Sequence, residues 1–233
     1  FQASAFNRST TSPKLNAVGA RLANSSAAML LTLIRHGPTE WNASRRFQGR
    51  TDVPLSPTGR AHALAAAGAL KSERIERIYS SDLQRALETA QIVGEPHGAQ
   101  ILTDERLREF DFGAWEGLTW VEIVARNPHL YGLGSTAATH YTPEGGESFA
   151  IVCERVGSFL DDLAAKELER AVVVTHAGPL HAMFTVLKLS GPGSADEHLS
   201  LSFAPGSISQ LHVEHGGAKI LRVNDRRHIH AAD

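Results

Sequence analysis

The sequence is poor in cysteine, in net charge and in long apolar runs, and each shortage argues against a class of protein. Its 233 residues include one cysteine, Cys153, which excludes an intramolecular disulfide and favours a reducing compartment. The 23 lysines and arginines nearly balance the 25 aspartates and glutamates, so no broad basic field exists to hold nucleic acid or anionic lipid. No apolar run approaches the roughly 18 residues that cross a bilayer. We therefore expect a cytoplasmic protein without a nucleic-acid or membrane partner, and a homodimer is left open.

The first 28 residues lack acidic side chains and are rich in serine, alanine and asparagine. Transit peptides share this composition, but neither a sustained amphipathic period nor a secretory apolar core is present. We expect a disordered extension over residues 1–28 and a single domain over residues 29–233, because no linker or internal repeat divides the remainder. Met29 directly precedes the first apolar run, which indicates that the functional chain begins there.

The first apolar run ends abruptly at a cation and an imidazole. Residues 31–34 form a short stretch of leucine, threonine and isoleucine, typical of a buried strand, and Arg35 and His36 follow directly. Gly37 tolerates backbone angles that other residues avoid, which favours a turn here, and Pro38 prevents the strand from continuing. Since ligands collect beyond the carboxyl ends of strands in open α/β sheets, we expect the chemistry at this point.

The rest of the chain alternates strand and helix patterns, which predicts an α/β protein: a three-layer α/β/α sandwich with a mostly parallel central sheet. Ser56 and Pro57 mark one helix start, and Ser81 with Gln84 predicts a capping box at another. An irregular polar segment over residues 129–146 is expected to act as a lid or specificity segment. Strands are predicted over 75–79, 100–102, 171–175, 207–213 and 219–223, and helices over 57–70, 118–126, 149–163 and 179–189, besides the helix that Ser81 opens.

Polar groups are predicted at the carboxyl ends of three strands: Arg35 and His36 at the first, Arg85 at the second and His176 at the third. Each is followed by a turn or helix start, where backbone N–H groups favour anions. Arg85 lies off the apolar stripe of its helix and is expected to point out of the core. Any one of these residues could be a structural ion pair or a satisfied core histidine. Four of them at one sheet edge repel one another unless an anion binds, and phosphate suits the paired donors of guanidinium.

Four sequence blocks follow in order between residues 31 and 227. They are Arg35-His36-Gly37 with Trp41-Asn42, Gly49, Asp52 and Pro54-Leu55-Ser56; residues 81–86 with Thr89-Ala90; Leu107-Arg108-Glu109 with Phe112-Gly113 and residues 115–117; and residues 175–178. Together they resemble the histidine phosphatase superfamily, which contains the cofactor-dependent phosphoglycerate mutases and many small phosphatases. The block after Glu109 is similar to the small-phosphatase branch, including the α-ribazole phosphatase-like proteins. The resemblance implies a phosphoglycerate mutase-like fold.

The resemblance also implies a role for each residue of the site. His36 would attack phosphorus to give a phosphohistidine, with its attacking nitrogen neutral and its other ring N–H held by an acceptor. Glu109 would protonate the leaving oxygen and then activate water, although Asp111 and Glu116 stand close to it in the sequence. The residues expected to bind the phosphoryl group are Arg35, Asn42, Gln48, Gly49, Arg85, His176 and Ala177.

We therefore predict a phosphomonoester hydrolase that acts on a small phosphorylated metabolite; sugar phosphates, phosphoglycerates, ribazole phosphate and nucleotides all stay open as substrates. The alternative is a phosphoglycerate mutase, in which a sugar-acid hydroxyl takes the phosphoryl group in place of water. Mutases of the family characteristically carry paired arginines downstream, whereas Arg126 stands alone between residues 118 and 146. His181 stands where many relatives have arginine.

Two further classes are less well supported by the sequence. Twelve histidines and the His228-Ile229-His230 pair would suit a metalloenzyme, but there is no His-Glu-x-x-His motif and no carboxylate cluster at metal spacing. We therefore expect a metal-independent enzyme without a cofactor. A non-enzymatic phosphate-binding module is disfavoured because every catalytic position of the family is filled.

Overall fold

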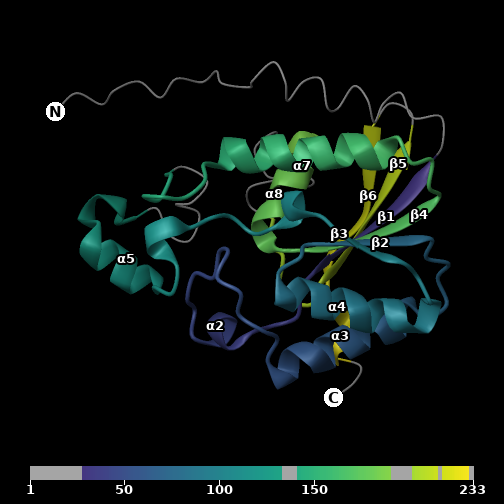
Figure 1. Ribbon diagram of the computed structural model, residues 1–233, viewed down its shortest axis with the longest axis horizontal. Helices are drawn as coiled ribbons and strands as arrows, with labels where there is room; N and C mark the ends of the chain where they lie inside the picture. Colours follow the sequence, from purple (N-terminus) through teal and green to yellow (C-terminus); the bar gives the residue numbers. More distant parts are fainter. Residues whose placement is uncertain (1–27, 133–140, 190–200, 215–216, 231–233) are drawn as a thin grey trace.

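The computed structural model describes residues 28–132, 141–189, 201–214 and 217–230. The strands of this described part form one sheet in the order β3-β2-β4-β1-β5-β6, and helices pack against both of its faces (Figure 1). Strands β3, β2, β4 and β1 are parallel, and β5 runs antiparallel to both β1 and β6. The strands are β1 (Met29–Arg35), β2 (Arg77–Ser80), β3 (Ile101–Thr103), β4 (Arg170–Thr175), β5 (Ile208–Glu214) and β6 (Gly217–Asp225). The predicted mostly parallel sandwich is confirmed.

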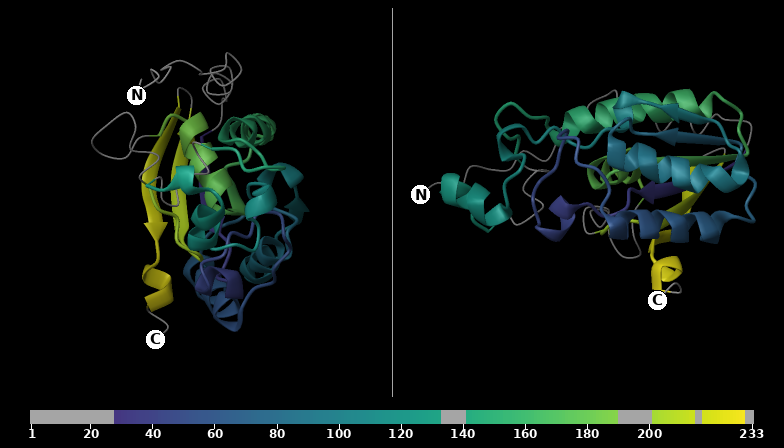
Figure 2. Two further views of the ribbon diagram at one scale, coloured as in Figure 1. Left: turned by 90° about the vertical axis from the view of Figure 1, so that its left-hand side faces the viewer. Right: turned by 60° about the horizontal axis from the view of Figure 1, so that its bottom comes forward.

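Helices α3 and α4 cover one face of the sheet, and α7 and α8 cover the other (Figure 1). Three short elements lie outside these layers: α2, α5 and α9. Helix α9 packs against α3. Helices α2 and α5 lie at one end of the sheet (Figure 2). The helices are α2 (Glu40–Ala43), α3 (Pro57–Leu70), α4 (Gln84–Gly94), α5 (Trp120–Arg126), α7 (Phe149–Ala164), α8 (Ala177–Val186) and α9 (Arg227–His230), with 3₁₀ turns at Glu95–His97, Glu105–Leu107, Gly113–Trp115 and Pro128–Leu130. None of these described helices is long and apolar enough to cross a membrane.

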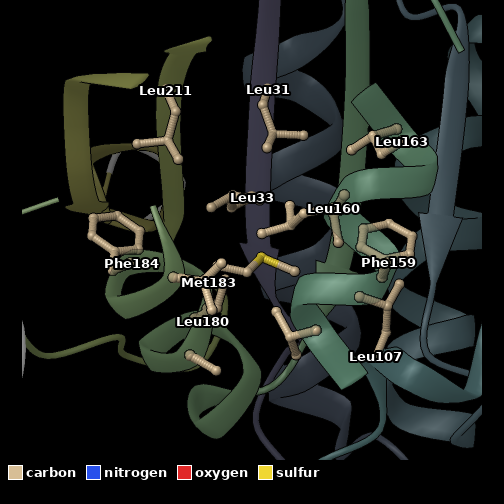
Figure 3. Close-up of a cluster of buried hydrophobic side chains, with 14 of the residues drawn as sticks. Leu31, Leu33, Leu107, Phe159, Leu160, Leu163, Leu180, Met183, Phe184 and Leu211 are labelled. Carbon is tan, nitrogen blue, oxygen red and sulfur yellow. The ribbon is translucent and has the colours of Figure 1, made fainter. Parts of the chain in front are cut away.

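Strand β1 contributes to a separate apolar core on each face, because successive side chains of a strand point to opposite sides. Leu31 and Leu33 pack among residues of α7 and α8, including Phe159 and Met183 (Figure 3). Ile34 packs on the other face with side chains of α3 and α4. Each fully buried side chain of this size contributes about 1.5–3 kcal/mol. The two cores fix β1 on both sides, so its carboxyl end is a rigid support for the residues that follow.

Two local expectations at helix starts are wrong. The Ser81–Gln84 capping box does not form: α4 begins at Gln84, and the Gln84 N–H donates to the Asp52 carboxylate at 2.7 Å. A carboxylate from a distant loop replaces the local cap, which no short-range pattern can predict. Helix α8 begins at Ala177, two residues before Pro179, and ends at Val186 rather than Leu189.

Gly37 is required for a different reason from the expected one. Its backbone has no positive φ. Instead, a Cβ added to Gly37 would lie 2.3 Å from the carbonyl oxygen of Gly59, and a Cβ on Gly59 would lie 2.1 Å from that of Pro38. The glycine therefore lets the segment after β1 approach the first turn of α3 closely.

The expectations for the amino-terminal extension and the lid segment fall largely outside the described residues. Of residues 1–28 only Ala28 is described, and residues 133–140 of the lid segment are likewise outside. Within the described part of that segment, Tyr141 stacks on Trp115 with ring centroids 5.7 Å apart. This contact joins the second half of the 129–146 segment to the residues that follow Glu109.

Candidate active site

The three predicted strand ends meet, because β2, β4 and β1 are parallel neighbours in the sheet. Arg35 is the last residue of β1 and pairs with Thr175, the last residue of β4, so His36 and His176 come next to each other. Their ring centroids are 5.0 Å apart, and both side chains are buried. Arg85 lies in the first turn of α4, which follows β2. The structure therefore brings together all four residues that the sequence places at strand ends.

The imidazole of His36 is held in one tautomer. Its Nδ1 lies 2.7 Å from the carbonyl oxygen of Gly37, and a carbonyl only accepts, so Nδ1 carries the proton and Nε2 keeps its lone pair. Burial lowers the pKa of His36 well below 6.5, and the positive charges of Arg85 and Arg35 lower it further, against the Gly37 bond that raises it. The neutral imidazole that a nucleophile needs is thus the stable form at neutral pH.

These surroundings predict that His36 and His176 stay neutral at pH 6. Burial also lowers the pKa of His176, with Arg85 and His36 adding to the shift. Because an unfolded histidine titrates near 6.5, the unfolded chain takes up protons first, and stability is lost as the pH falls below about 6.5. In a ¹⁵N-imidazole NMR titration, the two resonances assigned by substitution should keep neutral shifts at pH 6. Titration of either buried ring near 6.5 would contradict this.

The two arginines are held differently. Burial lowers the pKa of Arg35 to about 10, with Glu109 opposing and Arg85 adding to the shift, and its Nη1 donates to the carbonyl of Phe203. Arg85 is fully buried, and its guanidinium donates to the carbonyls of Gly49 at 2.7 Å and Thr51 at 3.0 Å. Arg85 does point out of the apolar core as expected, but into a closed polar site rather than toward solvent.

Several buried nitrogens of this cluster lack a hydrogen-bond partner within the described part of the chain. They are both ring nitrogens of His176 and the Nε atoms of Arg35 and Arg85. Buried polar groups normally have hydrogen-bond partners, so unpartnered nitrogens on three side chains of one cluster favour a ligand there. Because two of these side chains are guanidiniums, an anion is the ligand that suits them.

The carboxylate of Glu109 faces the same cluster. Its Oε1 accepts from the backbone N–H groups of Phe110 and Gly178, both at 3.0 Å, and its Oε2 takes part in neither bond. The side chain is buried, and it raises the pKa of both Arg35 and Arg85 by its charge. Gly178 leaves room for it: an added Cβ would lie 2.4 Å from Oε1.

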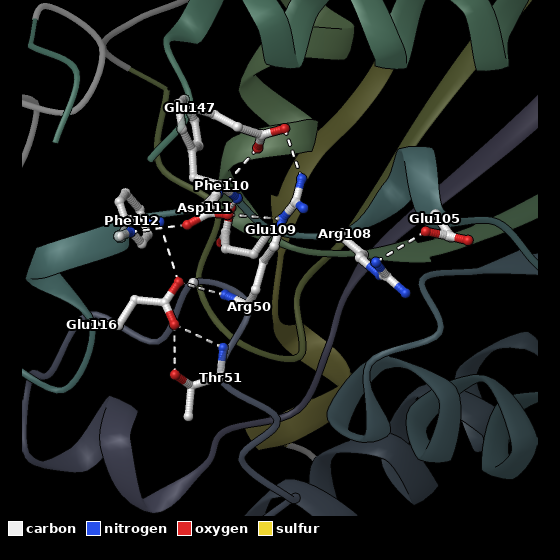
Figure 4. A network of polar contacts seen from close by, with 12 residues as sticks. Arg50, Thr51, Glu105, Arg108, Glu109, Phe110, Asp111, Phe112, Glu116 and Glu147 are labelled. Carbon is white, nitrogen blue, oxygen red and sulfur yellow. Dashed lines mark hydrogen bonds and ion pairs between the residues drawn. The ribbon is translucent and has the colours of Figure 1, made fainter. Parts of the chain in front are cut away.

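The neighbouring acidic residues have structural partners instead (Figure 4). Glu116 accepts from the backbone N–H groups of Arg50 at 2.8 Å and Thr51 at 2.9 Å, and so holds the loop after β1. Asp111 accepts from the N–H of Gly113 at 3.0 Å. Among the three carboxylates, Glu109 is the one whose charge acts on both Arg35 and Arg85; the charge of Glu116 acts on Arg85.

Four more of the expected phosphate-binding residues lie in the segments around the cluster. Asn42 accepts from the Thr39 backbone with Oδ1, and Gln48 accepts from the Thr39 hydroxyl with Oε1, so both amide NH₂ groups can still donate. Gly49 has φ +53° and gives its carbonyl to Arg85. Ala177 is the first residue of α8, where a helix leaves N–H groups without partners inside the helix.

Thr89 supports the site, although the sequence alone assigns it no role beyond its place in a sequence block. Its hydroxyl accepts from the N–H of Gly37 at 3.2 Å and donates to the carbonyl of Arg85 at 2.7 Å. It thereby joins the end of β1 to α4. Its spacing of four residues from Arg85, on the same helix face, is the signal that could have revealed it.

The residues that the structure describes contain no group of three or more histidine, cysteine, aspartate or glutamate side chains placed to hold a metal ion. His228 directs its Nε2 to the carbonyl of Gly206 at 3.0 Å. The side chain of His230 lies outside the described part.

His36 keeps one ring nitrogen without a proton, and it interacts electrostatically with Arg35 and Arg85, which in turn interact with Glu109. Such a cluster at the strand ends of an α/β/α sandwich is the arrangement expected of an enzyme that handles phosphoryl groups. The chain belongs to the histidine phosphatase superfamily (branch 1), whose family model matches residues 31–226. This membership confirms the predicted family and its fold, and the phosphatases among its relatives confirm the predicted enzyme class, a phosphoric monoester hydrolase.

Known proteins of this family resemble the chain over most of its length. The phosphoglycerate mutase-like protein 4 of Arabidopsis thaliana is 40% identical over 158 residues, which cover 66% of this chain and 69% of that protein. A glucosyl-3-phosphoglycerate phosphatase of Mycobacterium tuberculosis is 37% identical over 199 residues, or 77% and 89% of the two chains. The solved structure of a mycobacterial glucosyl-3-phosphoglycerate phosphatase in complex with VO3 superimposes with a TM-score of 0.74 at 33% identity, covering 85% of this chain and all (100%) of that one.

Proposed function

We propose that the protein hydrolyses small phosphomonoesters in two steps, through a phosphohistidine on His36. The observation that carries this proposal is the bond between Nδ1 of His36 and the carbonyl of Gly37, which leaves Nε2 neutral and nucleophilic next to Arg35 and Arg85. Covalent catalysis divides the transfer of a phosphoryl group to water into two easier transfers.

In the first step, Nε2 of His36 forms a bond to phosphorus as the bond from phosphorus to the ester oxygen breaks. The protonated carboxyl group of Glu109 gives its proton to that oxygen, so the alcohol leaves uncharged. In the second step, Glu109 as carboxylate takes a proton from water while the water oxygen attacks phosphorus. The bond to Nε2 breaks, inorganic phosphate is released, and Glu109 is protonated again.

The charge on the phosphoryl oxygens is balanced by groups whose positions are already fixed. Donors that are oriented before the reaction stabilise the developing charge, and loss of one typically costs about 100- to 1,000-fold in rate. The groups proposed for this role are the guanidiniums of Arg35 and Arg85, an Nε2–H of His176, the amide NH₂ groups of Asn42 and Gln48, and the N–H of Ala177. For Gly49 we propose the indirect role of holding Arg85 through its carbonyl.

The proposal includes a small phosphorylated substrate as the ligand and a reducing compartment, such as the cytoplasm, as the location. Burial raises the pKa of the Cys153 thiol to about 12, so this cysteine is a packing residue and no nucleophile.

The test of the function is turnover of purified protein against a panel of phosphorylated metabolites. We expect release of inorganic phosphate that continues in EDTA, because all of the proposed charge stabilisation comes from groups of the protein itself. Interconversion of phosphoglycerates with stimulation by 2,3-bisphosphoglycerate would show a mutase instead. Loss of activity in EDTA, restored by a divalent cation, would show a metalloenzyme.

The general-acid role of Glu109 predicts a dependence on the leaving group. Glu109→Gln should lower kcat/KM about 100-fold or more for an alkyl phosphate but only a few-fold for p-nitrophenyl phosphate, whose nitrophenolate leaves without a proton. Asp111→Asn is the matched control and should lower both values equally. Equal losses for the two substrates in Glu109→Gln would assign the acid to another group.

A further inference from the structure

The carboxylate of Glu147 joins three segments of the chain beside the proposed acid (Figure 4). It accepts from the guanidinium of Arg50 at 2.8 Å, from that of Arg155 at 3.0 and 3.2 Å, and from the backbone N–H of Asp111 at 3.1 Å. The side chains of Glu147 and Arg155 are only 12% and 13% exposed, so most of the surface of this ion pair is covered by protein, while Arg50 stays more exposed. Burial raises the pKa of Glu147, but Arg155, the Asp111 N–H and the charge of Arg50 together outweigh this and hold the pKa below its usual value.

Arg155 also forms hydrogen bonds to the backbone of the segment that ends at Glu109. Its Nη1 donates to the carbonyl of Arg106 at 2.6 Å, and its Nη2 donates to the carbonyl of Glu109 at 3.1 Å. Arg155 lies on α7, which packs against α8. One guanidinium therefore attaches the backbone of Glu109 to the helix layer that also carries Gly178.

The position of the Glu109 carboxylate depends on this attachment. Its Oε1 is held by the N–H of Phe110 from its own segment and by the N–H of Gly178 from α8. Both bonds form only if the 109–110 backbone stays at a fixed distance from the start of α8. A shift of about 1 Å in a catalytic group can cost about 100-fold in rate.

The same cluster continues into the loop that contains Gln48 and Gly49. Arg50, which bonds to Glu147, follows Gly49, and the carbonyl of Gly49 accepts from Arg85. The turn before Glu147 is also tightly fitted, since a Cβ on Gly146 would lie 2.4 Å from the carbonyl oxygen of Asp111. Glu147 is thus fixed relative to the backbone that follows the proposed acid.

We propose that Arg155 and Glu147 are positioning residues, which set the place of the Glu109 carboxylate relative to the phosphoryl group without touching the substrate. This inference rests on the proposed role of Glu109. The cluster fixes the 109–111 backbone from α7 and from the 143–147 turn, so its loss displaces the proton donor more than it displaces His36.

The experiment compares Arg155→Lys and Glu147→Gln with wild type on an alkyl phosphate and on p-nitrophenyl phosphate. Each variant keeps the approximate size of the side chain, but Arg155→Lys cannot bond to both carbonyls and the carboxylate in the same geometry. We expect kcat/KM to fall about 30- to 100-fold for the alkyl phosphate and less than about 3-fold for p-nitrophenyl phosphate. This parameter covers the steps up to release of the alcohol, in which the proton is delivered. Asp162→Asn is the control, because it removes a different α7 ion pair, to Arg106, and should change neither value.

A structural role alone gives a different result. If Arg155 and Glu147 only stabilised the fold, each variant would have a lower midpoint of thermal unfolding, and its kcat/KM values for the two substrates would fall by the same factor. That result would overturn the inference. Glu109→Gln in the same assays distinguishes a failure of the proposed function from a failure of this inference. If that variant shows no dependence on the leaving group, Glu109 is not the acid; if it does but Arg155→Lys and Glu147→Gln do not, the positioning role alone is wrong.

Discussion

Replacement of His36 by alanine should abolish hydrolysis and prevent phosphorylation of the protein. The ring is the one group in the proposed mechanism that forms a bond to phosphorus, and loss of a covalent nucleophile can cost about 10⁶-fold in kcat. The remaining cations would still bind substrate, so the loss should fall on kcat rather than on KM. The residual rate would come from water that attacks phosphate held by Arg35 and Arg85.

The measurement is a rapid acid-free quench after mixing with ³²P-labelled substrate, followed by tests of the protein-bound label. Wild type should carry label that is stable to base and labile to acid, as a phosphohistidine is, whereas His36→Ala should carry none. His212→Ala is the control, since His212 lies on β5 beside Glu214 and is partly exposed. Label of the same stability on His36→Ala would place the phosphoryl group on another residue and end the proposal.

The strand-end residues could be predicted because the rule that places them is local and general. A buried parallel strand that stops at a polar residue puts that residue at the ligand edge, and this holds for His36 and His176; Arg85 reaches the same edge from the first turn of the helix after β2. The proximity of their side chains then follows from the sheet order. The four sequence blocks resemble those of the histidine phosphatase superfamily, and this resemblance indicated phosphoryl transfer. The positions of the strand ends alone do not define the reaction.

The parts that were missed depend on contacts between distant segments. Asp52 caps α4 from another loop, and Gly37 is needed for its approach to Gly59 rather than for its own backbone angles. The Glu147–Arg155 cluster likewise acts on residues about 40 positions earlier. A single sequence shows the turn before Glu147 but gives no sign of what the carboxylate will meet.

Replacement of Arg85 by methionine should have the second-largest effect, on catalysis and on ligand binding together. Arg85 is the fully buried cation of the site, and we expect kcat/KM to fall about 1,000-fold, the upper range for loss of one oriented donor. The carbonyls of Gly49 and Thr51 would also lose their donor, at a cost of about 1–3 kcal/mol for each buried acceptor. Arg85→Lys should recover little, because an ammonium cannot bond to two carbonyls and to phosphate as a guanidinium does.

Binding of vanadate separates the loss of the anion site from simple destabilisation. At 100 times its Kd, a ligand specific to the native state adds about 2.7 kcal/mol to the free energy of unfolding of wild type, and Arg85→Met should lose nearly all of that gain. The pKa of His36 should rise at the same time, since the charge of Arg85 is one of the causes that lower it. Arg60→Met is the control, because Arg60 forms an exposed ion pair with Glu88 on the neighbouring helix and should keep both activity and stabilisation by vanadate. If Arg85→Met kept wild-type kcat/KM and bound vanadate as before, the buried guanidinium would have no part in holding the phosphoryl group, because this change removes both its charge and its donors.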